Sequence, residues 1–159
     1  MTRAEELTLP ALIGVVAGLR SMTAPAIITW AARRGTLRVS GSSLLSMAIG
    51  SGSHRAIELA LGELLADKLP FTPNRINPGP LAWRVLMGAA SGAAIATSIR
   101  RPVVEGAVLG SLGALAGAFA GFYARKEASR RRSGLASALV EDAIAVGIGA
   151  AVVWRASRA

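Results

Sequence analysis

The chain contains no cysteine and very few aromatic residues. Among its 159 residues there are three Trp, three Phe, one Tyr and one His. The absence of cysteine excludes a disulfide framework, a thiolate metal site and a cysteine nucleophile. A metal site built on His54 would need several carboxylate partners, and so few aromatic rings provide no stacking platform for nucleic-acid bases. We therefore expect no metal, no cofactor and no nucleic-acid partner.

Charge is also scarce for a water-soluble domain, whereas apolar residues are abundant. Only 17% of the residues are charged, 52% are hydrophobic, and the mean hydropathy is +0.48. The net charge is +9, and the Lys and Arg residues lie in short clusters between apolar stretches. This pattern is typical of charges that flank membrane spans. The length permits one domain, so we expect residues 1–159 to form a single integral-membrane helical domain, multi-pass in the inner (plasma) membrane.

Five apolar stretches are candidates for membrane-spanning helices, which need about 20 residues each. They cover residues 9–32, 43–65, 81–99, 103–125 and 135–154. The second stretch is interrupted by the polar residues 50–55, so it is either a broken span or a half-buried amphipathic helix at the membrane surface. The sequence therefore predicts an all-α, polytopic helix bundle of about five spans, the second one broken or partial.

The stretch 103–125 is both the most apolar and the most glycine-rich. Its five glycines recur at spacings of four, three, four and four, which places them on one stripe of a helix. Small residues on one face let a neighbouring backbone approach closely, and this contact drives helix association in lipid. We therefore predict glycine-zipper packing, although a stripe that lines a solute path is an open alternative. The packing glycines are Gly14, Gly18, Gly88, Gly92, Gly106, Gly110, Gly113, Gly117 and Gly121.

Arg20 lies near the midpoint of the first stretch, about 120° from the small-residue stripe of that helix at 100° per residue. A lone arginine at the centre of a span costs about 2.5–3.5 kcal/mol on insertion scales, so it should face the bundle interior and pair with an acid. Two roles are open for Arg20. It is either part of an ion pair that fixes helix register or a contact for a substrate or ion.

The last stretch supplies two carboxylates for such a pair. Glu141 and Asp142 are adjacent, so they cannot face the same direction on a helix. We expect one of them to meet Arg20 and the other to take Arg84, a backbone amide or water, or to stay protonated. Arg84 lies near the start of the third stretch, where its long side chain can instead extend to the lipid headgroups.

Four segments carry a resemblance to a known family. They are AGLRSMTAP (residues 17–25), GELLADKLPFTPNR (62–75) with PGPLAWR (78–84), the glycine stripe ending in GFYAR, and ALVEDAIAVG (138–147). In this order they resemble the bacterial integral-membrane family called domain of unknown function 4126. The resemblance implies a membrane architecture and points to Arg20, Glu63, Asp67, Lys68 and Glu141 with Asp142. The polar residues 50–55 depart from the apolar second span that the resemblance implies, and the family name carries no activity.

The distribution of basic residues bears on topology. Five spans would place eight Lys and Arg residues on one side and seven on the other, and a chain with so little bias can insert both ways and form an antiparallel homodimer. Four spans would give a strong bias instead. The basic loop 125–134 is expected to meet anionic lipids. Order along the chain also suggests an inverted repeat, in which stretch 103–125 and the following acidic helix echo the first stretch and its acidic helix.

The function that fits these residues best is transport. Arg20 and Arg84 would offer positive charge to a small ion or anionic solute, and the carboxylates Glu63, Asp67, Glu141 and Asp142 would tune that charge or carry protons. The alternative is a non-catalytic scaffold, or a module that binds lipid or a protein partner, whose ion pairs are purely structural. An enzyme would need a nucleophile or a metal beside paired carboxylates, and neither accompanies them. We therefore predict no catalytic residues.

Overall fold

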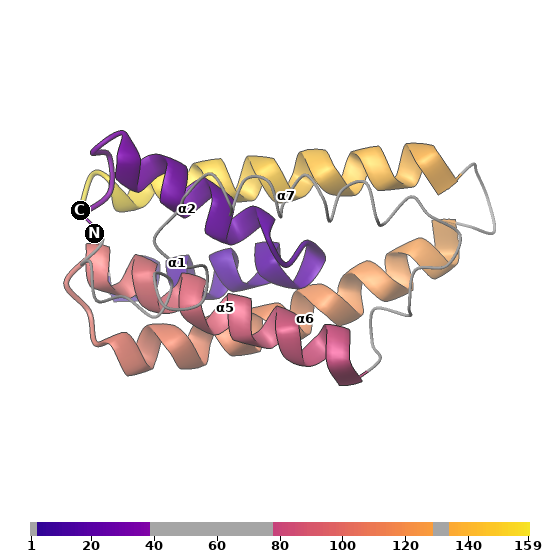
Figure 1. Cartoon of the computed structure of the whole chain (residues 1–159), viewed down its shortest axis with the longest axis horizontal. Helices are drawn as coiled ribbons and strands as arrows, with labels where there is room; N and C mark the ends of the chain where they lie inside the picture. Colours follow the sequence, from indigo (N-terminus) through magenta and orange to yellow (C-terminus); the bar gives the residue numbers. More distant parts are fainter. Residues whose placement is uncertain (1–2, 39–77, 129–133) are drawn as a thin grey trace.

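The computed structural model describes residues 3–38, 78–128 and 134–159, and all regular structure within these ranges is α-helical. The helices are α1 (Arg3–Leu19), α2 (Thr23–Arg33), α5 (Pro78–Ser98), α6 (Val103–Ala128) and α7 (Gly134–Ala156). They run lengthwise beside one another, with both termini at the same end (Figure 1). The all-α class is thus confirmed for the described residues. The expected second stretch, residues 43–65, lies outside them.

The first apolar stretch folds as a helical hairpin. α1 ends at Leu19, the chain turns over residues 20–22, and α2 runs back toward the end at which α1 begins (Figure 1). Two contacts with α7 confirm the reversal. Glu5 of α1 pairs with Arg155 near the end of α7, and Ile27 of α2 lies against Gly149, further back along the same helix. The prediction of one continuous span over residues 9–32 is therefore wrong.

Pro25 disfavours a continuous helix at this point, although Pro10 is accommodated inside α1. Proline has no N–H, so it cannot donate to the carbonyl oxygen of Ser21, and its ring collides with that carbonyl in a continuous helix. Pro25 is instead the third residue of α2, within the first turn, where the amide protons have no helical partner. Arg20 consequently lies in the turn between two helices and not on a helix face.

The hairpin redistributes the basic residues. Five spans would place Arg3 and Arg33 on opposite sides, but the structure brings them to one end (Figure 1). The described basic residues at this terminal end include Arg3, Arg33, Arg34, Arg100, Arg101, Arg155 and Arg158. The opposite placement of Arg3 and Arg33, on which the near balance of basic residues depended, is therefore not observed. The hypothesised inverted repeat also finds no support here, because a hairpin and the single helix α6 are not equivalent elements.

α6 lies between α1 and α5 and approaches both at backbone distance. A Cβ added to Gly92 of α5 or to Gly14 of α1 would lie 2.8 Å from the Cα of Gly110, so Gly110 marks the point where three helices meet. Gly106 faces the carbonyl oxygen of Gly92, and Gly113 faces α1. The glycines of α6 therefore leave the space that the neighbouring main chains occupy, which explains why they recur along one helix.

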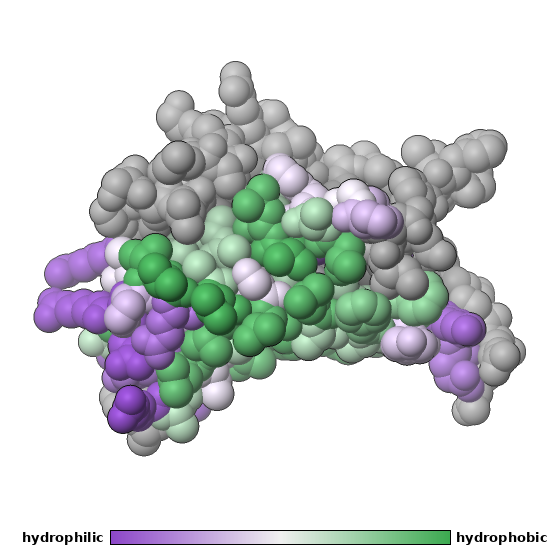
Figure 2. All heavy atoms as spheres, turned by 90° about the horizontal axis from the view of Figure 1, so that it is seen from below, coloured by the Kyte–Doolittle hydropathy of each residue, from purple (hydrophilic) through white to green (hydrophobic). Residues whose placement is uncertain are grey.

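Many small side chains lie in the interior beside a few large ones such as Ile13, Ile28 and Met87. Of the described alanines, those at positions 17, 24, 31, 94, 96, 114, 118 and 145 are fully buried. Large apolar residues of α6 are exposed instead, among them Val104, Leu112 and Tyr123. Figure 2 shows a broad hydrophobic surface with hydrophilic residues at its two ends. Among the described helices, only the segment Val103–Glu127 is long and apolar enough to cross a membrane, judged by length and composition. A five-span bundle is therefore not confirmed.

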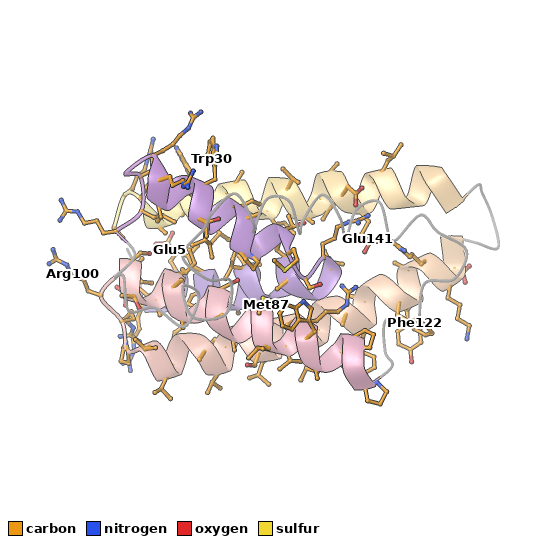
Figure 3. All side chains as sticks on the ribbon, viewed as in Figure 1. Glu5, Trp30, Met87, Arg100, Phe122 and Glu141 are labelled. Carbon is orange, nitrogen blue, oxygen red and sulfur yellow. The ribbon has the colours of Figure 1, made fainter. Side chains whose placement is uncertain are left out.

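Ion pairs tie three helices together at the terminal end. Arg155 of α7 donates to Glu5 of α1 at 2.6 Å, and Arg101 contacts both Glu105 of α6 at 2.8 Å and Glu6 of α1 at 3.7 Å. In Figure 3, Glu5 and Arg100 lie toward this end, and Phe122 and Glu141 lie toward the opposite one. These pairs are partly exposed, so each stabilises the fold by only about 0–1 kcal/mol.

We predict that Gly110→Ala lowers the free energy of unfolding by about 1–3 kcal/mol, because a methyl group there must displace main-chain atoms of Gly88 and Gly92 on α5. The measurement is denaturant unfolding of the detergent-solubilised protein followed by circular dichroism. Gly147→Ala is the matched control, since nothing lies within 4 Å of a Cβ at Gly147. The control should be neutral or stabilising by up to about 1 kcal/mol. Equal stabilities of the two variants would contradict the packing role.

Candidate functional site

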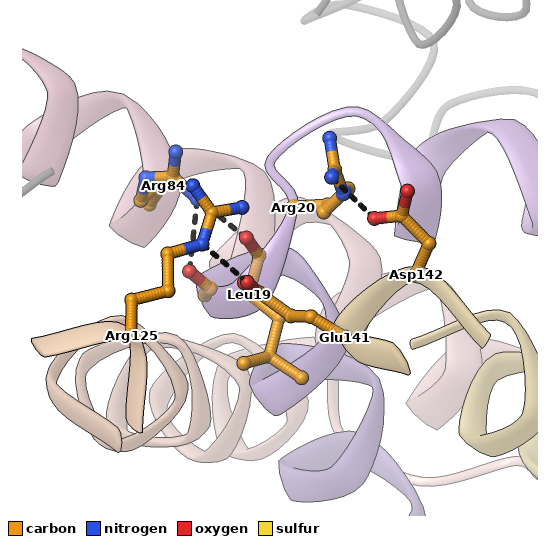
Figure 4. Close-up of polar contacts among 7 residues, drawn as sticks. Leu19, Arg20, Arg84, Arg125, Glu141 and Asp142 are labelled. Atoms are coloured by element: carbon orange, nitrogen blue, oxygen red, sulfur yellow. Dashed lines mark hydrogen bonds and ion pairs between the residues drawn. The ribbon is translucent and has the colours of Figure 1, made fainter. Parts of the chain in front are cut away.

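The end of α1 lies inside the protein, and Arg84 of α5 donates hydrogen bonds to its last carbonyl groups. The last carbonyl groups of a helix have no partner within the helix and need donors from elsewhere. Nη1 of Arg84 donates to the carbonyl oxygens of Gly18 and Leu19 at 2.9 and 3.0 Å (Figure 4). Arg84 is only 5% exposed, so the expectation that it extends to the headgroups is wrong. Its positive charge also complements the negative end of the α1 dipole.

Arg20 occupies the turn of the hairpin and is 2% exposed. Its guanidinium forms an ion pair with the carboxylate of Asp142 on α7 (Figure 4). The prediction that Arg20 turns inward and meets one of the two adjacent acids is therefore confirmed. A guanidinium and a carboxylate removed from water stabilise a fold only where each compensates the other, and removal of one partner is strongly destabilising.

Glu141 points to a different partner from its neighbour. Nε of Arg125, near the end of α6, donates to Oε2 of Glu141 at 2.6 Å. Arg125 is thus a partner of the second acid that the sequence analysis did not name. The two adjacent acids of α7 thus connect it to α6 on one side and to the hairpin turn on the other.

These five side chains form one charged cluster, defined as Arg20, Arg84, Arg125, Glu141 and Asp142. Side-chain exposure differs widely among its members. The side chain of Arg125 is 29% exposed, that of Asp142 is 17% exposed and that of Arg20 is 2% exposed. Asp142 precedes Arg155 by 13 residues on α7, a rise of about 20 Å. The cluster therefore lies far from the terminal end and opens toward the opposite end, where α6 finishes.

The cluster combines three guanidinium groups with two carboxylates. Guanidinium groups are forked donors suited to carboxylate, phosphate and other oxyanions. Carboxylates beside them hold the guanidinium groups in place and accept protons. In the part of the chain that the structure describes, there is no group of His, Asp and Glu side chains arranged to hold a metal ion.

Several expected site residues lie outside the described ranges. Glu63, Asp67 and Lys68 belong to this group. Arg125 is a member that the sequence reasoning missed, because it was assigned to the basic loop. Its spacing carries the signal, since Arg125 follows Gly121 by four residues and so continues the glycine stripe. Arg84 precedes Gly88 by four residues in the same way, which predicts an inward position.

We predict that Asp142→Asn lowers the free energy of unfolding by about 3–5 kcal/mol, because it leaves the buried charge of Arg20 without this counter-charge. Glu5→Gln is the matched control. It removes a pair whose side chains are 39% and 55% exposed, and the expected cost is about 0–1 kcal/mol. Thermal and denaturant unfolding of both variants gives the comparison. A loss for Asp142→Asn no larger than that for Glu5→Gln would show that the inner pair contributes little.

Comparison with known proteins leaves the identity of the chain open. No family model, no curated protein and no solved structure matches it. The resemblance to domain of unknown function 4126 therefore stays a prediction from the sequence. The function has to be argued from the surface and the charged cluster.

Proposed function

We propose that this chain is a small integral membrane protein, multi-pass in the plasma membrane, whose charged cluster binds a small ion or anionic solute during transport. Support for the membrane placement comes first from the surface. Large apolar side chains are exposed on α6 and α7, including Val108, Leu112, Ile144 and Val146. An apolar surface this broad (Figure 2) is unfavourable in water and suits a lipid environment. Homo-oligomer formation and contact of the basic loop 125–134 with anionic lipids belong to the same proposal.

The aromatic residues support the same placement. None of the six described aromatic side chains belongs to the buried core, whereas soluble domains usually bury most of theirs. Trp30 and Trp154 lie near the terminal end, and Trp83, Phe122 and Tyr123 lie near the opposite end. Trp and Tyr are enriched at the two membrane–water interfaces. Two groups separated by the length of the helices are the pattern that such interfaces produce.

The observation that carries the transport proposal is the charged cluster at the break between α1 and α2. Ionisable groups within a membrane bundle are costly and commonly mark ion or substrate pathways. Short helices that end inside the bilayer are a recurring way to expose helix termini to a solute. Beyond Arg20, toward the terminal end, the fully buried apolar residues Ile13, Ile28 and Met87 fill the interior. This arrangement favours a gated transporter, entered from the Arg125 side, over an open pore.

The second candidate is a membrane scaffold whose charges are purely structural. Arg84 favours this function, because it donates two hydrogen bonds to the end of α1 and so has a structural role in the hairpin. Close helix contacts of the glycine-zipper type would then serve only to hold the bundle together. The two functions differ in one measurable respect, namely whether replacing Arg20 by lysine changes the movement of a solute in a protein that stays folded.

We predict that Ala4, Arg34 and Ala159 face one side of the membrane and that Lys126 faces the other. The hairpin makes this arrangement necessary, whereas five continuous spans would separate Ala4 from Arg34. Because the chain has no cysteine, single Cys substitutions at these positions can be labelled without a background mutation. Modification of intact cells and of inverted vesicles by an impermeant maleimide gives the sidedness. Labelling of Ala4→Cys and Arg34→Cys from opposite sides would contradict the hairpin.

We predict that the purified protein in liposomes moves protons or a small anion, and that Arg20→Lys lowers the flux by at least about tenfold while the protein stays folded. A lysine keeps the charge but lacks the planar fork that grips an oxyanion. Arg100→Lys, an exposed arginine at the terminal end, is the matched control and should transport as the wild type does. Folded protein that moves none of protons, halides, phosphate or small carboxylates would rule out transport and favour the scaffold.

A further inference from the structure

α1 and α7 leave a groove between them that the charged cluster does not use. It follows α1 from Glu5 to Leu12 and α7 from Ile148 to Arg155, and it has a volume of about 370 Å³. The lining positions recur at three- and four-residue spacings on both helices, so the groove runs parallel to the helix axes. Over seven residues it extends about 10 Å. Its volume falls within the range of sites that hold small molecules, about 300–1,000 Å³.

The polarity of the groove changes along its length. Glu5 and Arg155 close it at the terminal end, where their side chains are 39% and 55% exposed. Toward the middle of the bundle it is lined by Leu9, Leu12 and Ile148. One end therefore offers a positive and a negative charge to the solvent side, and the other end offers only hydrocarbon.

We propose that this groove binds one phospholipid of the adjacent leaflet, with an acyl chain between α1 and α7 and the headgroup phosphate on Arg155. The guanidinium is a forked donor for phosphate oxygens. Glu5 lies beside it and favours a headgroup that carries an ammonium group. The inference rests on the membrane placement proposed above but is independent of transport.

The position of the groove in the proposed membrane supports this occupant. Trp154 lies next to Arg155 in the sequence and is exposed, and the guanidinium of Arg158 stacks over its ring at 3.9 Å. On α2, Arg34 stacks over Trp30 at 4.3 Å in the same way. Such pairs belong at headgroup depth, because the ring is amphipathic and the guanidinium seeks water or phosphate. The charged end of the groove is therefore at the depth of phosphates, and its apolar end is at the depth of acyl chains.

The other occupants fit less well. A helix with its side chains is about 10–12 Å across, which is as wide as this groove is long, so a second copy of the chain would cover the groove without filling it. A polar solute would find hydrocarbon along most of the wall. A phospholipid matches both the change of polarity and the direction of the groove.

The test is native mass spectrometry of the full chain purified in mild detergent with equal amounts of phosphatidylethanolamine and phosphatidylglycerol of the same acyl chains. We expect the wild type to retain one phospholipid, with phosphatidylethanolamine preferred. Arg155→Gln should lower retention by about tenfold, since it removes a charged partner of the phosphate. Arg158→Gln is the matched control, because Arg158 is an exposed neighbour outside the lining, and it should retain lipid as the wild type does.

A second pair of variants tests the acyl chain. Ala151→Phe places a ring in the groove and should also reduce retention, whereas Ala150→Phe, exposed on α7 outside the lining, should not. Glu5→Gln should abolish the preference for phosphatidylethanolamine. If Ala151→Phe does not fold, Arg155→Gln decides alone. Wild-type retention by a folded Ala151→Phe or by Arg155→Gln would overturn the proposal. Lipid retention by a protein that moves no ion would contradict the transport proposal and support the lipid-binding groove. The failure of one proposal can therefore be told from the failure of the other.

Discussion

The structure depends on the fact that α1 ends inside the protein. A helix terminus that is not at a surface exposes carbonyl oxygens whose partners must come from other elements, and the guanidinium of Arg84 meets those of Gly18 and Leu19. Once the chain has turned there, Arg20 is brought into the interior and requires an acid, which α7 provides as Asp142. The end of α1 thus accounts for the buried Arg84, and the turn that follows it accounts for the buried pair of Arg20 and Asp142.

A second constraint is the closeness of the main chains around α6. Where Gly110 meets Gly14 and Gly92, the main chains of three helices leave no room for a side chain between them. In the membrane placement that we propose, these contacts stabilise the bundle through dispersion between backbones, and its inner ion pairs are weakly screened.

Much of the architecture could be predicted from residue spacing alone. The all-α class follows from the apolar stretches, and the inward position of Arg20 follows from the cost of a charge in lipid. The hairpin could not be found by counting apolar residues, because residues 9–32 are long enough for one span and Pro25 also fits a small-residue stripe. The missing amide proton of Pro25 does not locate the break by itself, because Pro10 is accommodated inside α1. The partners of Glu141 and Asp142 depend on how α6 and α7 face each other, which no local pattern encodes.

The pairing of Arg20 with Asp142 has a consequence for biosynthesis. The two residues are separated by 122 positions, and a ribosome adds about 5–20 residues per second. The hairpin turn is therefore made roughly 6–24 s before its counter-ion exists. In the membrane placement that we propose, the nascent chain has to keep this guanidinium hydrated or held by the insertion machinery during that interval, so the N-terminal hairpin is expected to reach its final depth only after translation of α7.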